Sequence, residues 1–212
     1  MESYVDDMSK MALALTSAQM AKDVAVSEYG IGEDIATHFL GWSNKYLLLI
    51  FQMKKALTLL SPEEKFNRCK ELCETMRKYW GIASLTMVAE GYCSLDATQT
   101  ENTQLATAFL DKNKPVFECI TVSHASLDDS GSVTPVSMVA APYTVGVGKV
   151  VDWRDVLVYP ESADKYLKQA KYPKMLRNSL MENPVDEFGE GQAIKIRDEM
   201  NELGFIVQDF TV

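Results

Sequence analysis

Two apolar runs separated by a short cluster of Asp, Ser and Gly form the most regular pattern in the chain. The runs are residues 117–124 and 135–141, and the cluster is 125–131. Asp, Ser and Gly tolerate the tight or left-handed backbone of a turn, so this pattern predicts an antiparallel hairpin. The glycines of 146–148 predict a second reversal before the apolar run 150–158. The region therefore predicts an antiparallel β-meander.

Two proline positions refine this prediction. Pro142 interrupts the second run, and because proline has no N–H to donate, its strand is expected to lie at a sheet edge or to carry a bulge there. Pro62 follows Ser61, and Glu64 stands where a capping box needs it. We therefore expect a helix from residue 62 to about residue 79, which is a length typical of globular proteins.

The N-terminal quarter is less clear from its pattern. Residues 4–29 have apolar positions at helical spacing, which fits one amphipathic helix or two short ones broken near 16–17. Residues 35–53 could form a hairpin, but the leucine-rich stretch 45–53 is equally good helix material. The remaining pattern predicts a strand at 85–95, helices at 101–110 and 193–203, a helix from 160 that Pro173 kinks or divides, and a strand within 205–212.

Together these elements predict an α+β fold. We expect a single antiparallel meander of residues 83–95, 116–125, 135–145 and 150–158, packed against the N-terminal helix and the helix of 62–79. The sequence divides into an α+β core domain at 1–160 and a C-terminal appendage of helices and tail at 161–212, packed on the same domain.

Composition and charge narrow the class of protein. The chain has 212 residues, is 47% hydrophobic and carries a net charge of −9, which fits a globular protein that repels polyanions. The first residues lack the basic and apolar regions of a signal peptide, and the longest apolar run, 46–51, is too short to cross a bilayer. We therefore expect a cytoplasmic protein with reduced cysteines, no membrane contact and no bound cofactor.

Four segments carry a family resemblance. They are the capped helix, 85–93, 117–122 and 139–143. In sequence they resemble uncharacterised proteins encoded by bacteriophages, marine ones in particular, over roughly residues 60–160. The resemblance implies an α+β fold and a host-cytoplasmic setting, and it assigns a role to none of these residues.

Carboxylates on the predicted strands are the first candidate site. Glu90 and Glu118 are acids within predicted strands, and His124 lies six residues after Glu118, on the same face of a strand. Such carboxylates could bind a divalent metal for hydrolysis, or they could form the solvated face of a one-sided sheet. Ser123 points away from His124, which excludes a nucleophile and base pair between these neighbours.

The cysteines are the second candidate site. Cys69 and Cys73 share a face of the predicted helix, and Cys93 and Cys119 lie on strands that could pack against it. Four thiolates would suit zinc, but the short CxxC spacing of zinc knuckles is missing, so a reduced buried core is the alternative. Gly146-Val-Gly-Lys149 lacks the outer residues of a phosphate loop and is interpreted as a turn.

A basic ridge is the third candidate. Cations recur every third residue with tyrosines between them, so a helix would place them on one slowly winding stripe. This stripe could contact an acidic partner or phosphates, or it could be a solvated helix face. Its members are Lys165, Tyr166, Lys168, Lys171, Tyr172, Lys174 and Arg177.

The function that follows is binding. Since no catalytic constellation is complete along the chain, we expect an accessory protein that acts through a protein partner, with self-association possible. Nucleic acid is expected only through the basic ridge. The alternative is a divalent-metal-dependent hydrolase or nuclease that uses Glu90 and Glu118.

Overall fold

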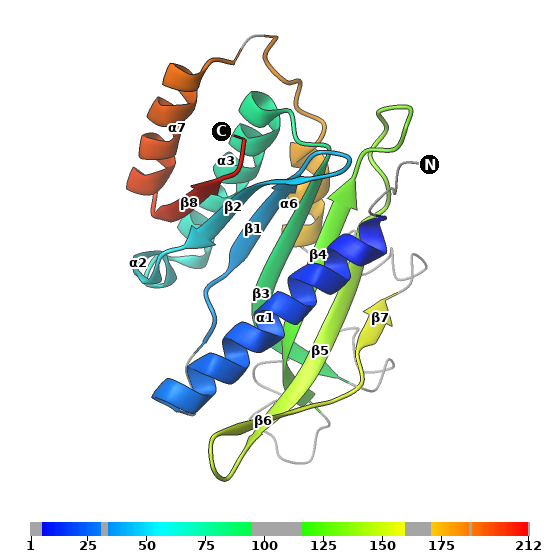
Figure 1. Cartoon of the computed structure of the whole chain (residues 1–212), viewed down its shortest axis with the longest axis vertical. Coiled ribbons are helices and arrows are strands. Elements are labelled where there is room, and N and C mark those ends of the chain that lie inside the picture. The colour runs from blue at the N-terminus through cyan, green and yellow to red at the C-terminus, as the bar shows by residue number, and fades with distance from the viewer. Residues whose placement is uncertain (1–5, 31–33, 95–115, 160–170, 187, 212) are drawn as a thin grey trace.

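A computed structural model of the chain describes residues 6–30, 34–94, 116–159, 171–186 and 188–211. Its centre is an eight-stranded antiparallel sheet in the order β6-β5-β4-β3-β1-β2-β8, with β7 paired to β5 (Figure 1). The strands are β1 (His38–Trp42), β2 (Leu47–Met53), β3 (Ser84–Ser94), β4 (Val116–Ser126), β5 (Ser137–Gly146), β6 (Val150–Trp153), β7 (Leu157–Tyr159) and β8 (Phe205–Asp209). The helices are α1 (Asp7–Tyr29), α2 (Lys55–Thr58), α3 (Pro62–Trp80), α6 (Lys171–Ser179) and α7 (Glu190–Glu202). The predicted α+β class is confirmed.

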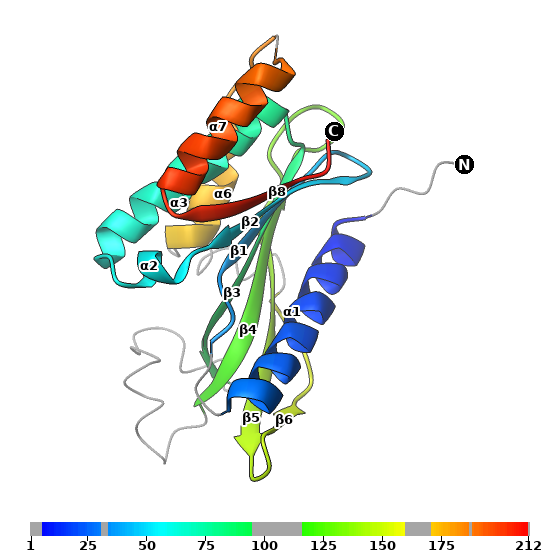
Figure 2. The ribbon, with the colours of Figure 1, turned by 60° about the vertical axis from the view of Figure 1, so that its left-hand side comes forward.

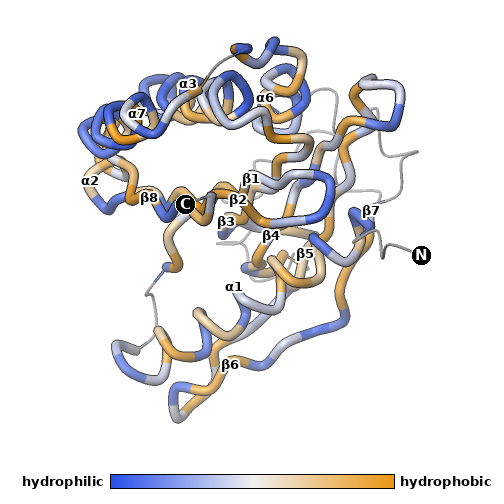
Figure 3. The backbone as a smooth tube through the Cα atoms, turned by 45° about the horizontal axis from the view of Figure 1, so that its top comes forward, coloured by the Kyte–Doolittle hydropathy of each residue, from blue (hydrophilic) through white to orange (hydrophobic). Residues whose placement is uncertain are grey.

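The helices lie on both faces of the sheet. Figure 2 shows α1 on one face and α3, α6 and α7 on the other, and Figure 3 shows the apolar strands between these two layers. Leu40, Val88 and Ile120 are buried on the side of α1. Phe39 and Leu85 belong to the larger core on the side of α3 and α6. Alternate residues of each strand thus enter different cores, which is the period of two expected for a sheet covered on both faces.

The predicted meander is present. Val122 on β4 pairs with Val88 on β3 and with Val139 on β5, and both pairings are antiparallel. In the turn after β4, the Asp128 carboxylate accepts hydrogen bonds from the backbone N–H groups of Ser130 and Ser132. The turn is therefore closed by the Asp and Ser residues from which it was predicted.

Pro142 corrects one expectation. Its strand, β5, is not at the edge of the sheet, because β4 pairs with one side of it and β6 and β7 pair with the other. β6 pairs with residues 143–146 and β7 with residues 138–140, so Pro142 falls in the gap between them. The missing N–H is accommodated by this break in the neighbouring strand, and the Pro142 carbonyl accepts from Arg154 N.

The start of α3 is the predicted capping box. Ser61 Oγ accepts from Glu64 N at 3.3 Å, and the Glu64 carboxylate accepts from Ser61 N at 3.1 Å. Gly81, at a φ of 58°, ends the helix in the left-handed conformation. The inward face of α3 carries Cys69, Leu72, Cys73 and Met76.

The structure decides between the alternatives that the pattern left open in the N-terminal quarter. Residues 7–29 form one unbroken helix, and 45–53 contain the strand β2, paired with β1 in a hairpin. The buried face of α1 contains Met11 and Leu15 from the apolar pattern, but it also contains Lys10 and Lys22, whereas Met8, Met20 and Val24 are exposed. Apolar residues lie on both sides of this helix, so periodicity could not select the inward face.

The C-terminal segment completes the same sheet. β8 pairs antiparallel with β2, which confirms the predicted terminal strand. The described helix α6 continues through Pro173, and α7 begins at Glu190. The predicted helix at 101–110 and the predicted start of a helix at 160–164 lie outside the described residues. No described helix combines the length and apolar character needed to cross a bilayer.

Candidate functional site

A polar network joins the start of α1 to the middle of the sheet. The Nε2 atom of His124 on β4 lies 3.0 Å from Asp7 Oδ1, in a direction too bent for a hydrogen bond, so the contact is electrostatic. The His124 Nδ1 atom is 2.8 Å from Thr86 Oγ1 on β3. Ser126 donates to Asp7 Oδ2 at 2.6 Å. The contacts with His124 and Ser126 lower the pKa of the Asp7 carboxyl.

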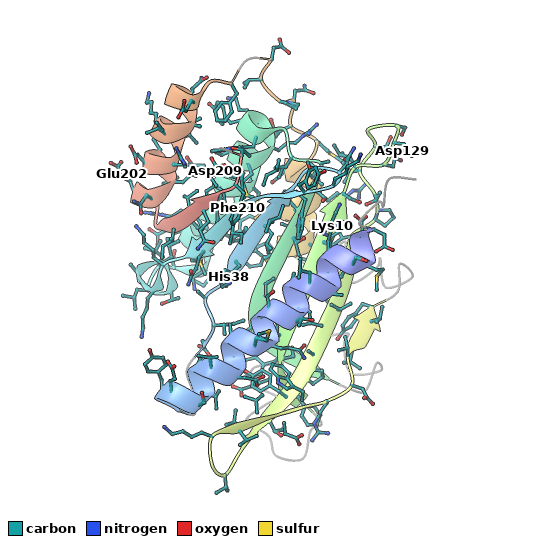
Figure 4. All side chains as sticks on the ribbon, viewed as in Figure 1. Lys10, His38, Asp129, Glu202, Asp209 and Phe210 are labelled. Atoms are coloured by element: carbon teal, nitrogen blue, oxygen red, sulfur yellow. The ribbon has the colours of Figure 1, made fainter. Side chains whose placement is uncertain are left out.

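A cavity of about 250 Å³ opens beside this network. Asp7, Lys10 and Ser126 contribute to its wall, together with the loop residues Asp128 and Asp129. The Lys10 ammonium is buried and donates to Ser84 Oγ at 3.2 Å (Figure 4). Both charge signs line the cavity, so it selects neither an anion nor a cation by charge.

A second buried ion pair lies farther along α1. Lys22 Nζ is 2.8 Å from Glu90 Oε1, and only 2% of Lys22 is exposed. Tyr143 OH donates to the same oxygen at 3.2 Å, and Ile35 N donates to Oε2 at 3.1 Å. Burial raises the pKa of Glu90 to about 7, with Lys22 opposing this shift and Asp34 adding to it.

These contacts bear on the metal hypothesis. Glu90 and Glu118 both face α1, and Glu118 pairs with Tyr143 across the sheet. His124 is on the same face, but it lies six residues after Glu118 along β4, where Asp7 contacts it. Among the described residues, no three His, Cys, Asp or Glu side chains gather as a metal site would require. Glu90 thus contacts Lys22 and His124 contacts Asp7, so these two candidates belong to different networks.

The four cysteines are also divided. Cys69 and Cys73 lie in the core under α3, whereas Cys93 and Cys119 belong to a separate cluster with Ala140. Burial raises the pKa of Cys69 to about 12 and raises that of Cys73 as well. The Cys119 thiol hydrogen-bonds to Cys93, which lowers the pKa of Cys93 and raises that of Cys119. The structure does not bring these four thiols to one zinc-binding point.

The basic ridge is described only in its second half. Lys165, Tyr166 and Lys168 lie outside the described residues. The Tyr172 ring packs edge-on against Phe66, with centroids 5.4 Å apart, and lies against the main core.

The three cations in the described half of the basic ridge have different surroundings. Lys171 Nζ lies 4.0 Å from the centre of the Phe66 ring, and Lys174 is exposed. Arg177 lines a hollow at the end of α6. The tyrosine of this half is therefore engaged with the protein itself, and it is not free to stack on a partner.

An apolar groove runs beside α1. It has a volume of about 280 Å³ and lies between α1 and the strands β1, β2 and β8. Leu13 and Ile206, on its two walls, are 56% and 45% exposed. Its lining residues are Leu13, Ala14, Ser17, Ala18, Ala21, His38, Leu40, Leu47, Ile50, Gln52, Val88, Ile206 and Gln208. None of them is an acid, a lysine or an arginine, and burial lowers the pKa of His38, which favours its neutral form.

The groove and the two lysines were missed by reasoning from sequence. Lys10, Ala14, Ala18 and Lys22 follow one another at steps of four, so one face of a helix carries all of them. Small residues between two lysines would have indicated a helix that lies close to a sheet, with ion pairs at both ends. No family model, curated protein or solved structure matches the chain.

Proposed function

We propose that the protein is an accessory protein that binds an amphipathic helix of a partner protein in the groove between α1 and strands β1, β2 and β8. The observation that supports it is the unequal covering of the sheet. α1 lies over β3, β4, β5 and β6, while α3, α6 and α7 cover the opposite face. On the side of α1, Leu40 and Trp42 of β1 are buried in the core with α1, whereas β2, β8 and the His38 end of β1 have no covering helix among the described residues.

The dimensions of this open face fit one helix. Three neighbouring strands span roughly 10 to 14 Å across the sheet, at about 4.8 Å per strand. An α-helix with its side chains is about 10 to 12 Å in diameter. A helix laid beside α1 would therefore complete the layer, as helices cover sheets within other α+β domains.

The chemistry of the groove favours an apolar helix face. Leu47 and Ile50 supply its apolar floor, Ile206 adds an apolar wall, and Gln52 and Gln208 are its polar neighbours on the strands. The outer side of α1 adds exposed Met20 and Val24. Contiguous exposed apolar surface of this kind marks interaction sites in folded proteins. Since the lining bears no formal charge, an apolar helix would bury no unpaired ion there.

The proposal also places the protein in the cytoplasm. Reduced thiols at all four cysteines and the absence of a membrane-spanning helix among the described residues support the cytoplasm. The sequence resemblance supports the cytoplasm of a phage host. A metal-dependent hydrolase receives no such support, because the Glu90 carboxylate is held by Lys22 and Tyr143.

Site-specific photo-crosslinking tests the groove. A photoreactive phenylalanine analogue at Leu13 should yield an adduct in producing cells, and mass spectrometry should map the adduct to an amphipathic helix of another protein. Ile206→Asp should reduce the adduct at least about tenfold, because a carboxylate would be buried against apolar residues. Val147→Asp is the matched control, since Val147 is exposed in the turn between β5 and β6.

Two results would overturn the proposal. An adduct whose yield is equal in Ile206→Asp and Val147→Asp would show that the groove is not the contact. Adducts that join only two copies of this chain, with a dimer seen by light scattering, would assign the surface to self-association.

A further inference from the structure

A second hollow, separate from the apolar groove, is lined by two arginines. It is an open hollow with a volume of about 460 Å³, bordered by the end of α3, the turn after β4 and the segment after α6. Arg77 comes from α3 and Arg177 from α6, which brings together residues that are a hundred positions apart in the sequence. The volume is within the range of about 300 to 1,000 Å³ that is typical of small-molecule sites.

Arg77 is held rigidly at this hollow. Its Nε atom donates to the Glu182 carbonyl at 3.0 Å, and its Nη1 atom donates to the Ile82 carbonyl at 2.8 Å. The Nη2 group forms no hydrogen bond with the described residues. Because Nε and Nη1 already donate to backbone carbonyls, the Nη2 donors of Arg77 are the ones available for a ligand, and they are held in place at little entropic cost.

Arg177 forms fewer hydrogen bonds with the protein than Arg77 does. Its Nε atom is buried and has no hydrogen-bond partner, and its guanidinium forms no ion pair with the described residues. A buried charged donor without a partner is uncommon in folded proteins and destabilises the state that contains it. Because the Nε atom has almost no exposed surface, an acceptor in the hollow would bind the Nη groups of Arg177, which form no hydrogen bond with the described residues.

We propose that this hollow binds the phosphoryl group of a small phosphate monoester. Guanidinium groups present parallel N–H donors that match phosphate oxygens, and such bonds are stronger than neutral ones. Arg77 and Arg177 bring two positive charges to the hollow and Glu182, which also lines it, brings one negative charge, so the net charge is opposite to the charge of about −1.5 to −2 that a phosphate monoester carries at neutral pH. Val133, Leu180 and Met181 add an apolar wall for the organic part of the ligand. This site is independent of the proposed helix groove.

Calorimetric titration with inorganic phosphate and with phenyl phosphate tests this inference, at constant ionic strength. Both should bind, and phenyl phosphate should bind more tightly because its ring can contact the apolar wall. Arg177→Gln should weaken binding by at least about tenfold, the loss of roughly one charge-assisted hydrogen bond. Lys174→Gln is the matched control, because Lys174 is an exposed cation on the same helix and does not line the hollow.

Titrations with two further compounds distinguish between the possible classes of ligand. Malonate, a dicarboxylate, should bind more weakly than phosphate, and binding of equal or greater strength would overturn the phosphoryl assignment. A phosphoserine peptide that binds while phenyl phosphate does not would overturn the small-molecule assignment. Equal affinities in Arg177→Gln and Lys174→Gln, or no binding by the unaltered protein, would remove the site altogether. Arg177→Gln should fold normally, as circular dichroism can confirm, because it removes an unsatisfied donor.

Discussion

His124 Nε2 lies 3.0 Å from Asp7 Oδ1, so the first residue of α1 is joined to the central strand β4. The two residues are far apart in the sequence, and only the packing of α1 across the sheet brings them together. Nearer the other end of the same helix, Lys22 forms an ion pair with Glu90. α1 is therefore attached to the sheet by one charged contact near each end, with apolar packing between them.

The Asp7 contact predicts a response to acid. The folded pKa of Asp7 lies below its ordinary value of 3.8, so its stabilisation is complete well above that value and is lost as the pH falls through it and below. Asp7→Asn should lower the free energy of unfolding by about 1 kcal/mol at neutral pH, since Asp7 is partly exposed and solvent screens the contact. Urea unfolding from pH 7 to pH 3 should show a shallower decline for Asp7→Asn. The exposed Asp198→Asn should keep the original slope.

Glu90 predicts the opposite response, at higher pH. Its pKa is raised from 4.5 to about 7 in the folded chain, so the unfolded chain releases this proton first and stability falls as the pH rises from 4.5 to about 7. The decline should be on the order of 3 kcal/mol. Urea midpoints of Glu90→Gln should change less across this window. Glu202→Gln, exposed on α7 (Figure 4), should behave like the unaltered protein, and an equally steep profile for Glu90→Gln would contradict the assignment.

The Lys22–Glu90 pair predicts a coupled effect of substitution. Lys22→Met leaves the Glu90 carboxylate buried without its cation and should destabilise the protein by about 3 kcal/mol at pH 8. The loss should be smaller at pH 5, where Glu90 is largely protonated. Adding Glu90→Gln should recover part of the loss, which a double-mutant cycle measures.

Lys10→Met provides the control for that cycle. Lys10 is also buried on α1, but its carboxylate neighbour, Asp7, has a lowered pKa and stays ionised at both pH values. The effect of Lys10→Met should therefore be similar at pH 5 and pH 8. If Lys22→Met were equally insensitive to pH, Glu90 would not be the group that titrates.

Gly204 predicts a steric effect that can be separated from backbone strain. Gly204 has a φ of +104°, and a Cβ atom there would lie 2.7 Å from Leu57 Cγ. Gly148 has a φ of +94°, with no atom within 4 Å of such a Cβ. Gly148→Ala should cost about 1 kcal/mol from strain alone. Gly204→Ala should cost about 1 to 3 kcal/mol more from overpacking against Leu57, and thermal unfolding of the two variants measures the difference.

Local sequence determined several elements of this protein. Ser61 and Glu64 form a capping box because both partners are within one helical turn. Asp128 closes the turn after β4 through bonds to residues two and four positions away. The Asp, Ser and Gly residues of 125–131, between the apolar runs 117–124 and 135–141, set the antiparallel hairpin because they tolerate the backbone of a tight turn.

Tertiary structure decided the rest, because it depends on contacts between distant residues. Leucine-rich 45–53 became a strand because β1 on one side and β8 on the other satisfy its backbone groups. The inward face of α1 includes Lys10 and Lys22 because Lys10 donates to Ser84 and Lys22 pairs with Glu90. Both partners lie on β3, so the spacing of residues along the helix does not reveal them. The placement of Arg77 and Arg177 around one hollow, and the separation of Glu90 from His124, follow from the order of the strands and from the layer in which each helix packs. No local pattern encodes that order, since it is the burial of both sheet faces at once that selects it.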